Sequence, residues 1–372
     1  MRSPDRLAGL AHVATCSFLA ARLAPSAQFW VALGGGVALA RAGAKHGLRG
    51  GYGASCAAVV ETVALIGPAR VNGPLTQAFN APVIGTMDAR GASFTAQFLV
   101  CLVIRLLHYL LVNVLFVALV VGGLDAYVDS YDKIAGFLRV LPTGQTAAIV
   151  ITIIFNLLWA SFYSTVQVLA YRRALRRWPV ADDGVVAEGA SLERPPRPGR
   201  IALQVALVTI AAWVVMLVQL EWAVLAVVAG GLAVGCLILP RERLAGMRLG
   251  LALAAVFAVG AIGPAILGAV PWEDAGQRAA RAALLVLTAT WARSAAGADG
   301  VRALFGSFLW LLRFVPGARE AAGLTTMLRS DSRLTEAGRD LLDRLGPVEK
   351  SPLPVADALT EWVVAESERA PG

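Results

Sequence analysis

YRRALRRWP (residues 171–179) and RPPRPGR (residues 194–200) bound a charged segment in the middle of an otherwise apolar chain. Each charged side chain at the centre of a bilayer costs several kcal/mol, so this segment cannot lie in hydrocarbon. Loops rich in Lys and Arg stay on the cytoplasmic side of a membrane. The sequence therefore predicts that residues 172–200 form a basic, proline-rich cytoplasmic linker between two membrane halves.

The composition of the whole chain is that of a membrane protein. Of its 372 residues 57% are hydrophobic and 16% are charged, against about 25% charged in a typical soluble domain. The net charge of +8 comes from basic residues at the ends of apolar runs, which membrane topology and anionic headgroups explain better than nucleic-acid binding. We expect a multi-pass protein of the cell inner (plasma) membrane, with a cytoplasmic linker and C-terminus, contacts to the lipid bilayer and no nucleic-acid partner.

Apolar segments of near-membrane length predict an all-α, polytopic fold with about eight spans, because about 20 apolar residues cross a bilayer. The N-terminal membrane half is 1–171, the C-terminal half is 201–299, and 300–372 form an interfacial and cytoplasmic tail of amphipathic helices. The expected spans are Leu7–Leu23, Gln28–Ala40, Thr95–Leu124, Thr146–Ala170, Ile201–Leu220, Ala223–Leu239, Leu249–Val270 and Ala279–Ala292.

Tyr52–Ala69 is apolar enough to insert, but it carries Glu61 and ends in a Pro-Ala-Arg sequence. A full span here would place the basic linker outside the cell. We therefore interpret 52–69 as a re-entrant or interfacial segment. It is preceded by a cytoplasmic loop at 41–49, which holds three basic residues, and followed by a polar cytoplasmic stretch at 71–94.

No motif for catalysis or cofactor binding occurs in the sequence. Gly50–Gly53 is glycine-rich but lacks the order of a phosphate-binding loop. The histidines His12, His46 and His108 are too scattered for a metal centre, and the four cysteines form no CxxC pair. We expect no enzyme activity, no cofactor and no metal.

Polar residues on two expected spans share helix faces. Arg105, His108, Tyr109 and Asn113 follow at i, i+3, i+4 and i+8, and the next span carries a second polar face. Ionisable residues within a membrane are expensive and usually pair inside a helix bundle. These faces predict either a polar pathway or ligand contact, or hydrogen bonds that only join helices. The candidate site residues are Glu61 as a partner of Arg105, with His108, Tyr109, Asn113, Asn156, Tyr163 and Gln167.

Short motifs in the C-terminal half follow one another in a recognisable order. LLVLTAT (284–290) ends a span, LLRFVP (311–316) follows, and then come EAA (320–322) and MLRS (327–330). This order, over roughly 201–335, resembles the transmembrane (T) component of energy-coupling-factor transporters. The resemblance implies a membrane transport component that scaffolds a substrate-binding membrane protein and receives force from cytoplasmic ATPase subunits through its cytoplasmic helices.

The tail carries the residues that such docking would use. Leucines at 334, 341, 342 and 345 share one helix face, and this face needs to be buried against protein or lipid. We expect a soluble partner to dock there, with contacts from Arg313, Arg329 and Arg333; contact with anionic lipid alone is the alternative. For the chain as a whole, the alternatives to a transport component are a non-catalytic membrane scaffold or assembly factor and, less favoured, a membrane enzyme acting on lipids.

Overall fold

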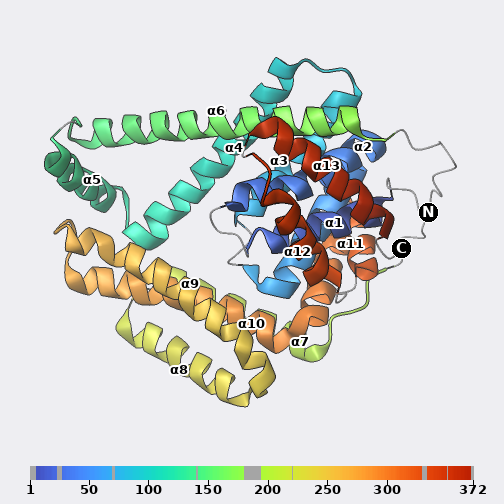
Figure 1. Cartoon of the computed structure of the whole chain (residues 1–372). Helices are drawn as coiled ribbons and strands as arrows, with labels where there is room; N and C mark the ends of the chain where they lie inside the picture. The colour runs from blue at the N-terminus through green and yellow to red at the C-terminus, as the bar shows by residue number, and fades with distance from the viewer. Residues whose placement is uncertain are drawn as a thin grey trace. The chain divides into compact units, whose positions relative to one another are not determined.

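The computed structural model describes residues 6–22, 27–68, 72–139, 141–179, 194–219, 221–328, 333–349 and 351–369. Within these ranges the regular structure is helical and contains no strand, as predicted (Figure 1). The helices are α1 Leu7–Ala20, α2 Gln28–Ile66, α3 Asn72–Ala89, α4 Phe94–Phe116, its π-helical extension η3 Val117–Val121, α5 Leu124–Leu138, α6 Gln145–Arg177, α7 Arg200–Val218, α8 Trp222–Ile238, α9 Arg241–Ile266, α10 Trp272–Leu311, α11 Ala318–Met327, α12 Arg333–Leu345 and α13 Pro352–Arg369.

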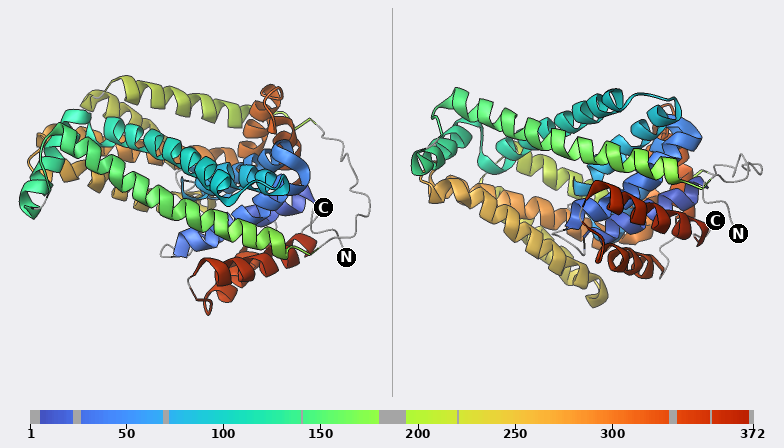
Figure 2. Two further views of the ribbon diagram at one scale, coloured as in Figure 1. Left: turned by 90° about the horizontal axis from the view of Figure 1, so that it is seen from above. Right: turned by 45° about the horizontal axis from the view of Figure 1, so that its top comes forward.

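Four helices among the described residues are long and apolar enough to cross a membrane: Phe94–Val121, Gln145–Arg177, Arg200–Val218 and Arg241–Ile266. In the first two, only 11% of the most apolar window is buried inside the protein, so their leucines, isoleucines and phenylalanines face outward as lipid-facing side chains do. Figure 2 shows α6 as one unbroken helix from both directions. The described part of the chain is therefore all-α with four membrane-length helices, and the count of about eight spans is not confirmed.

The chain divides into two compact units, each assembled from separated stretches of sequence. Unit 1 comprises 1–105, 161–199 and 298–372, and unit 2 comprises 106–160 and 200–297. Both units thus take residues from each side of the basic linker.

Unit 1 is built around α2, against which α1, α3, α11 and α13 pack. The expected cytoplasmic loop at 41–49 is instead helical, because only Gly47 leaves the helical conformation, with φ 68° and ψ −177°. A positive φ is readily available to glycine, so the helix resumes directly after it. The expected first span is also different: α1 has 14 residues and is buried on nearly all sides, including Leu10, Val13 and Phe18.

The crossing of α2 and α3 depends on small residues. A Cβ atom added at Gly85 would overlap the backbone of Ala40, and one added at Gly43 would overlap the backbone of Pro82. The Thr86 hydroxyl donates across this crossing to the carbonyl of Gly43 at 2.9 Å. Close backbone approach through small residues is the common way in which membrane helices pack. The polar stretch expected at the cytoplasmic surface is thus a helix of the unit 1 core.

The C-terminal helices also belong to this core. α12 packs on α1, and α13 packs on α1 and α2, so the red helices lie beside the blue ones in both views of Figure 2. Leu341 is fully buried on α12, and Leu359 and Trp362 of α13 lie against Gly34. Three leucines of the tail's apolar face, Leu341, Leu342 and Leu345, therefore pack on the core formed with the N-terminal helices, and the side chain of Leu334 lies outside the described residues. The sequence had suggested a soluble partner or lipid as the occupant of this face.

Unit 2 contains the parts of the membrane-length helices whose apolar side chains are exposed, together with two small clusters of buried apolar residues. Its notable polar contacts lie where η3 ends at Gly122 and Gly123, both with positive φ. Arg278 of α10 donates to the carbonyl of Val121 at 2.8 Å, and Arg281 donates to that of Leu119 at 2.6 Å. The last carbonyls of a helix lack partners and carry partial negative charge, so two arginines complete this helix end.

Candidate functional site

Three helices of unit 1 turn polar faces toward one another. The buried residues of α4 are Gln97, Cys101 and Arg105, spaced four apart on one face. α3 contributes Gln77 and Asn80, one helical turn apart, both 1% exposed or less. The third face, on α6, consists of Ser164, Gln167 and Tyr171. We call these eight residues the polar cluster: Gln77, Asn80, Gln97, Cys101, Arg105, Ser164, Gln167 and Tyr171.

The side-chain amide of Gln167 is the centre of the polar cluster. Its Oε1 accepts hydrogen bonds from the Arg105 guanidinium, from Asn80 Nδ2 at 3.2 Å and from Cys101 Sγ at 3.3 Å. Its Nε2 donates to Gln77 Oε1 and to the Tyr171 hydroxyl, the latter at 3.2 Å. Tyr171 in turn donates to Gln77. One amide therefore joins all three helices, as interhelical polar contacts do in membrane proteins.

Arg105 is 3% exposed, yet its partners are all neutral. It donates to Gln167 and lies over the ring of Tyr163, with 5.5 Å between the guanidinium carbon and the ring centroid. No carboxylate among the described residues lies within ion-pair distance of it. The nearby Asp88 is engaged elsewhere, by Gln97 at 3.0 Å and Arg172 at 3.4 Å. A buried guanidinium without a counter-charge is energetically costly.

Three buried atoms of the polar cluster have no hydrogen-bond partner among the described residues. They are Asn80 Oδ1, Gln97 Oε1 and Arg105 Nε, whereas the Ser164 hydroxyl lies beside the Cys101 thiol and hydrogen-bonds with it. More than nine in ten buried polar groups in proteins are paired, and clusters of exceptions mark sites of bound water, ions or function. The unmatched set contains two acceptors and a donor, so it fits water or a polar solute.

The structure brings only some of the expected site residues together. Arg105, Tyr163 and Gln167 meet as the helix faces predicted. His108, Tyr109, Asn113 and Asn156 are partly exposed and lie in unit 2. Six members of the cluster were not among the expected site residues, although the spacing of 97, 101 and 105 was a readable signal; they are Gln77, Asn80, Gln97, Cys101, Ser164 and Tyr171.

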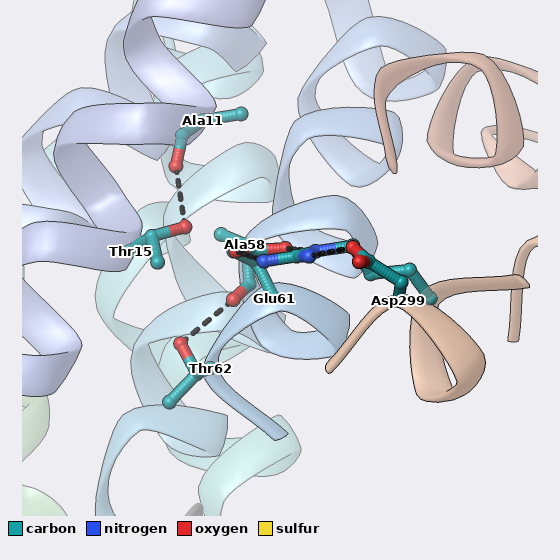
Figure 3. Close-up of polar contacts among 7 residues, drawn as sticks. Ala11, Thr15, Ala58, Glu61, Thr62 and Asp299 are labelled. Atoms are coloured by element: carbon teal, nitrogen blue, oxygen red, sulfur yellow. Dashed lines mark hydrogen bonds and ion pairs between the residues drawn. The ribbon is translucent and has the colours of Figure 1, made fainter. Parts of the chain in front are cut away.

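Glu61 does not pair with Arg105, so that prediction was wrong. It is 2% exposed and accepts hydrogen bonds from Arg302 of α10, one of them 2.6 Å from Arg302 Nε to Glu61 Oε2. Figure 3 shows a guanidinium between the carboxylates of Glu61 and Asp299. The hydrogen bonds with Glu61 raise the pKa of Arg302. Both oxygens of the Glu61 carboxylate thus have Arg302 as their partner, and neither residue belongs to the polar cluster.

The expected docking arginines are dispersed. Arg313 is exposed just after α10. Arg329 lies outside the described residues; Arg333 begins α12, but its side chain is also outside them. Groups of His, Cys, Asp and Glu suited to a metal ion are absent from the described part of the chain.

Comparison with known proteins finds no matching family model, no matching curated protein and no matching solved structure.

Proposed function

We propose that the protein is an integral membrane transport component in which the polar cluster contacts a small polar solute. The observation that carries this proposal is the group of three unmatched buried atoms on α3 and α4. If the polar residues only joined helices, we would expect each buried donor and acceptor to have a hydrogen-bond partner, because unmatched polar groups in an apolar surrounding destabilise the fold. At a binding site, by contrast, water or a solute makes the missing hydrogen bonds with such donors and acceptors.

Cys101 offers a direct test. Cys101 and Cys16 are both fully buried in the core of unit 1, but the thiol of Cys101 donates to Gln167 and thus belongs to the polar cluster. Two variants are compared in membrane vesicles: Cys101 as the sole cysteine (C16A, C56A, C236A) and Cys16 as the sole cysteine (C56A, C101A, C236A). We expect a water-soluble methanethiosulfonate to modify Cys101 about tenfold faster or more, because an apolar core admits reagent only when it unfolds. The readout is the mass of the intact protein over time. Equal, negligible modification of both thiols would contradict the proposal.

A second candidate role is coupling to ATPases in trans, as in the T components that the C-terminal motifs resemble. The apolar face of α12 is covered by α1, so docking would use the end of α10. There Phe308, Leu311 and Phe314 are 55%, 70% and 78% exposed beside Arg313. Purification in mild detergent should then bring an ATPase and a second membrane protein with the wild type, and Arg313→Glu should release the ATPase.

Arg139→Glu, an equal charge reversal at an exposed arginine of unit 2, is the control and should leave the complex intact. If no ATPase accompanies the wild type and Cys101 is also inert, a non-catalytic scaffold or assembly factor becomes the better proposal.

For topology we propose a location in the inner membrane with the basic linker and the C-terminus in the cytoplasm. The linker begins where α6 ends, and Arg173 and Arg177 near that end both pair with Asp357 of α13. This contact supports placing the linker and the C-terminal helix on the same side of the membrane. Reporter fusions at Gly184 and after Gly372 should give the same cytoplasmic signal; a signal from the opposite side at Gly184 would invert the topology.

A further inference from the structure

Two buried arginines of the described chain, Arg105 and Arg281, and the largely buried Arg302 differ in what balances their charge. Arg302 faces the carboxylates of Glu61 and Asp299. Arg281, 6% exposed, donates to the carbonyl of Leu119 at the negative end of a helix. Arg105 has a neutral amide and an aromatic face. Arginine cannot lower this cost by becoming neutral, because its guanidinium keeps its proton in proteins.

From this contrast we infer that the solute of the polar cluster is an anion, a small carboxylate that also carries a hydroxyl group. The inference rests on the proposed function and specifies its substrate class. A carboxylate supplies the counter-charge that Arg105 lacks and accepts from the free Nε–H, and guanidinium–carboxylate hydrogen bonds are among the strongest in proteins.

The hydroxyl group of the solute follows from the unmatched acceptors. Asn80 Oδ1 and Gln97 Oε1 are both buried and accept no hydrogen bond. A bare carboxylate has no donor for them, so it would leave both amide oxygens unmatched and would repel them. A hydroxylated carboxylate can pair with both the donor and the acceptors of the cluster. Its carboxylate oxygens accept from Arg105, and its O–H group donates to an amide oxygen.

The test uses Cys101 as the sole cysteine and three methanethiosulfonates of similar size: the anionic sulfonatoethyl, the cationic trimethylammonioethyl and the neutral hydroxyethyl reagent. All three react with the same thiol, so ratios of their rates cancel its intrinsic reactivity. We expect the anionic reagent to be favoured over the cationic one by on the order of tenfold relative to their rates with a free thiol, because a buried positive charge concentrates anions.

Arg105→Gln should abolish this preference and Arg105→Lys should retain it, while Arg281→Gln, which removes a buried arginine outside the cluster, should leave it unchanged. Because Arg105→Gln is required to fold, each variant is first checked for a single monodisperse peak in detergent. An anionic preference that is absent from the wild type, or that survives Arg105→Gln, would overturn the inference.

Protection experiments identify the class of anion. Lactate should slow the modification of Cys101, acetate should slow it less, and glycerol should have no effect. Protection by inorganic phosphate but not by lactate would overturn the carboxylate assignment. If Cys101 reacts with no reagent, the proposed function fails together with this inference. If Cys101 reacts with all three reagents at rates that do not depend on the charge of the reagent or on the Arg105→Gln substitution, the solute pathway stands and only the anionic substrate is rejected.

Discussion

Arg302 donates hydrogen bonds to both carboxylate oxygens of Glu61, although 241 residues separate the two in sequence. Glu61 is near the C-terminal end of α2, which ends at Ile66. Arg302 is in the segment of α10 that follows Gly297, where the helix is broken by a φ of 71° and a ψ of 167°. The break falls at the boundary between the two units, so residues 298–311 are free to join unit 1. The charge pair fastens this segment to α2.

Removing one member of this pair should therefore destabilise unit 1. Glu61→Gln and Arg302→Gln each leave a buried charge unmatched, which costs about 3–5 kcal/mol. The double variant E61Q/R302Q should lose much less than the sum of the two, because no lone charge remains. Denaturant unfolding in detergent measures all three. Asp299→Asn is the control with little effect, since Asp299 is 98% exposed; strictly additive losses would contradict the pairing.

Gly85→Ala should destabilise the protein although alanine is the better helix former. The added methyl group overlaps the backbone of Ala40, so α2 and α3 have to separate, and overpacking of this kind costs about 1–3 kcal/mol. Gly136→Ala in α5, where a Cβ atom meets nothing within 4 Å, should instead stabilise by up to about 1 kcal/mol. Opposite shifts of the thermal midpoint are the expected result, and shifts of the same sign would argue against the close crossing.

Trp362→Ala should release α13 from unit 1. Trp362 is fully buried and packs over Gly34 of α2, and loss of a buried tryptophan costs about 3–5 kcal/mol. Limited proteolysis should then cut within residues 346–369 in the variant and not in the wild type. Leu353→Ala, at a position 48% exposed in the same helix, should leave the wild-type pattern, and an unchanged pattern for the tryptophan variant would mean that α13 is held by other contacts.

Asp357→Asn should have little effect on α13 by comparison. The carboxylate pairs with Arg173 and Arg177, whose side chains are 38% and 48% exposed, and ion pairs that water reaches contribute little because water and salt screen them. We expect a thermal midpoint close to that of the wild type and the same proteolytic pattern. A release of α13 as complete as that expected from Trp362→Ala would show that charge, not apolar burial, holds the helix.

The membrane-length helices were the part of the fold that the sequence predicted well. Four expected spans overlap the membrane-length helices, namely α4 with η3, α6, α7 and α9. A lipid-facing helix needs a long, uninterrupted apolar surface, and such a run can be read directly from the sequence. α1 is equally apolar for a different reason: it is surrounded by protein. Hydropathy measures removal from water and does not distinguish a lipid neighbour from a protein neighbour, so Leu7–Leu23 was interpreted as a span.

The polar cluster was partly predictable for a related reason. Arg105 and Gln167 were each expected on the polar face of a span, because helical spacing places such residues on one face, but Gln167 was not the partner expected for Arg105. Gln77 and Asn80 were assigned to a surface stretch because their segment is polar overall, although its buried face packs through Gly85 and Ala81. The partner of Glu61 could not be predicted from a local sequence pattern, because Arg302 is 241 residues away in sequence and meets Glu61 only in the folded protein.

The discontinuous make-up of unit 1 has a consequence for biosynthesis. α1, α2 and α3 are translated first, but the helices that cover α1 and α2 come after residue 298. Translation of the intervening residues 90–297 takes roughly 10 to 40 seconds at about 5–20 residues per second. During that interval the faces that later receive Leu341, Leu359 and Trp362 have no partner from this chain. The nascent N-terminal helices therefore need a temporary apolar environment, which a bilayer provides and an aqueous compartment does not.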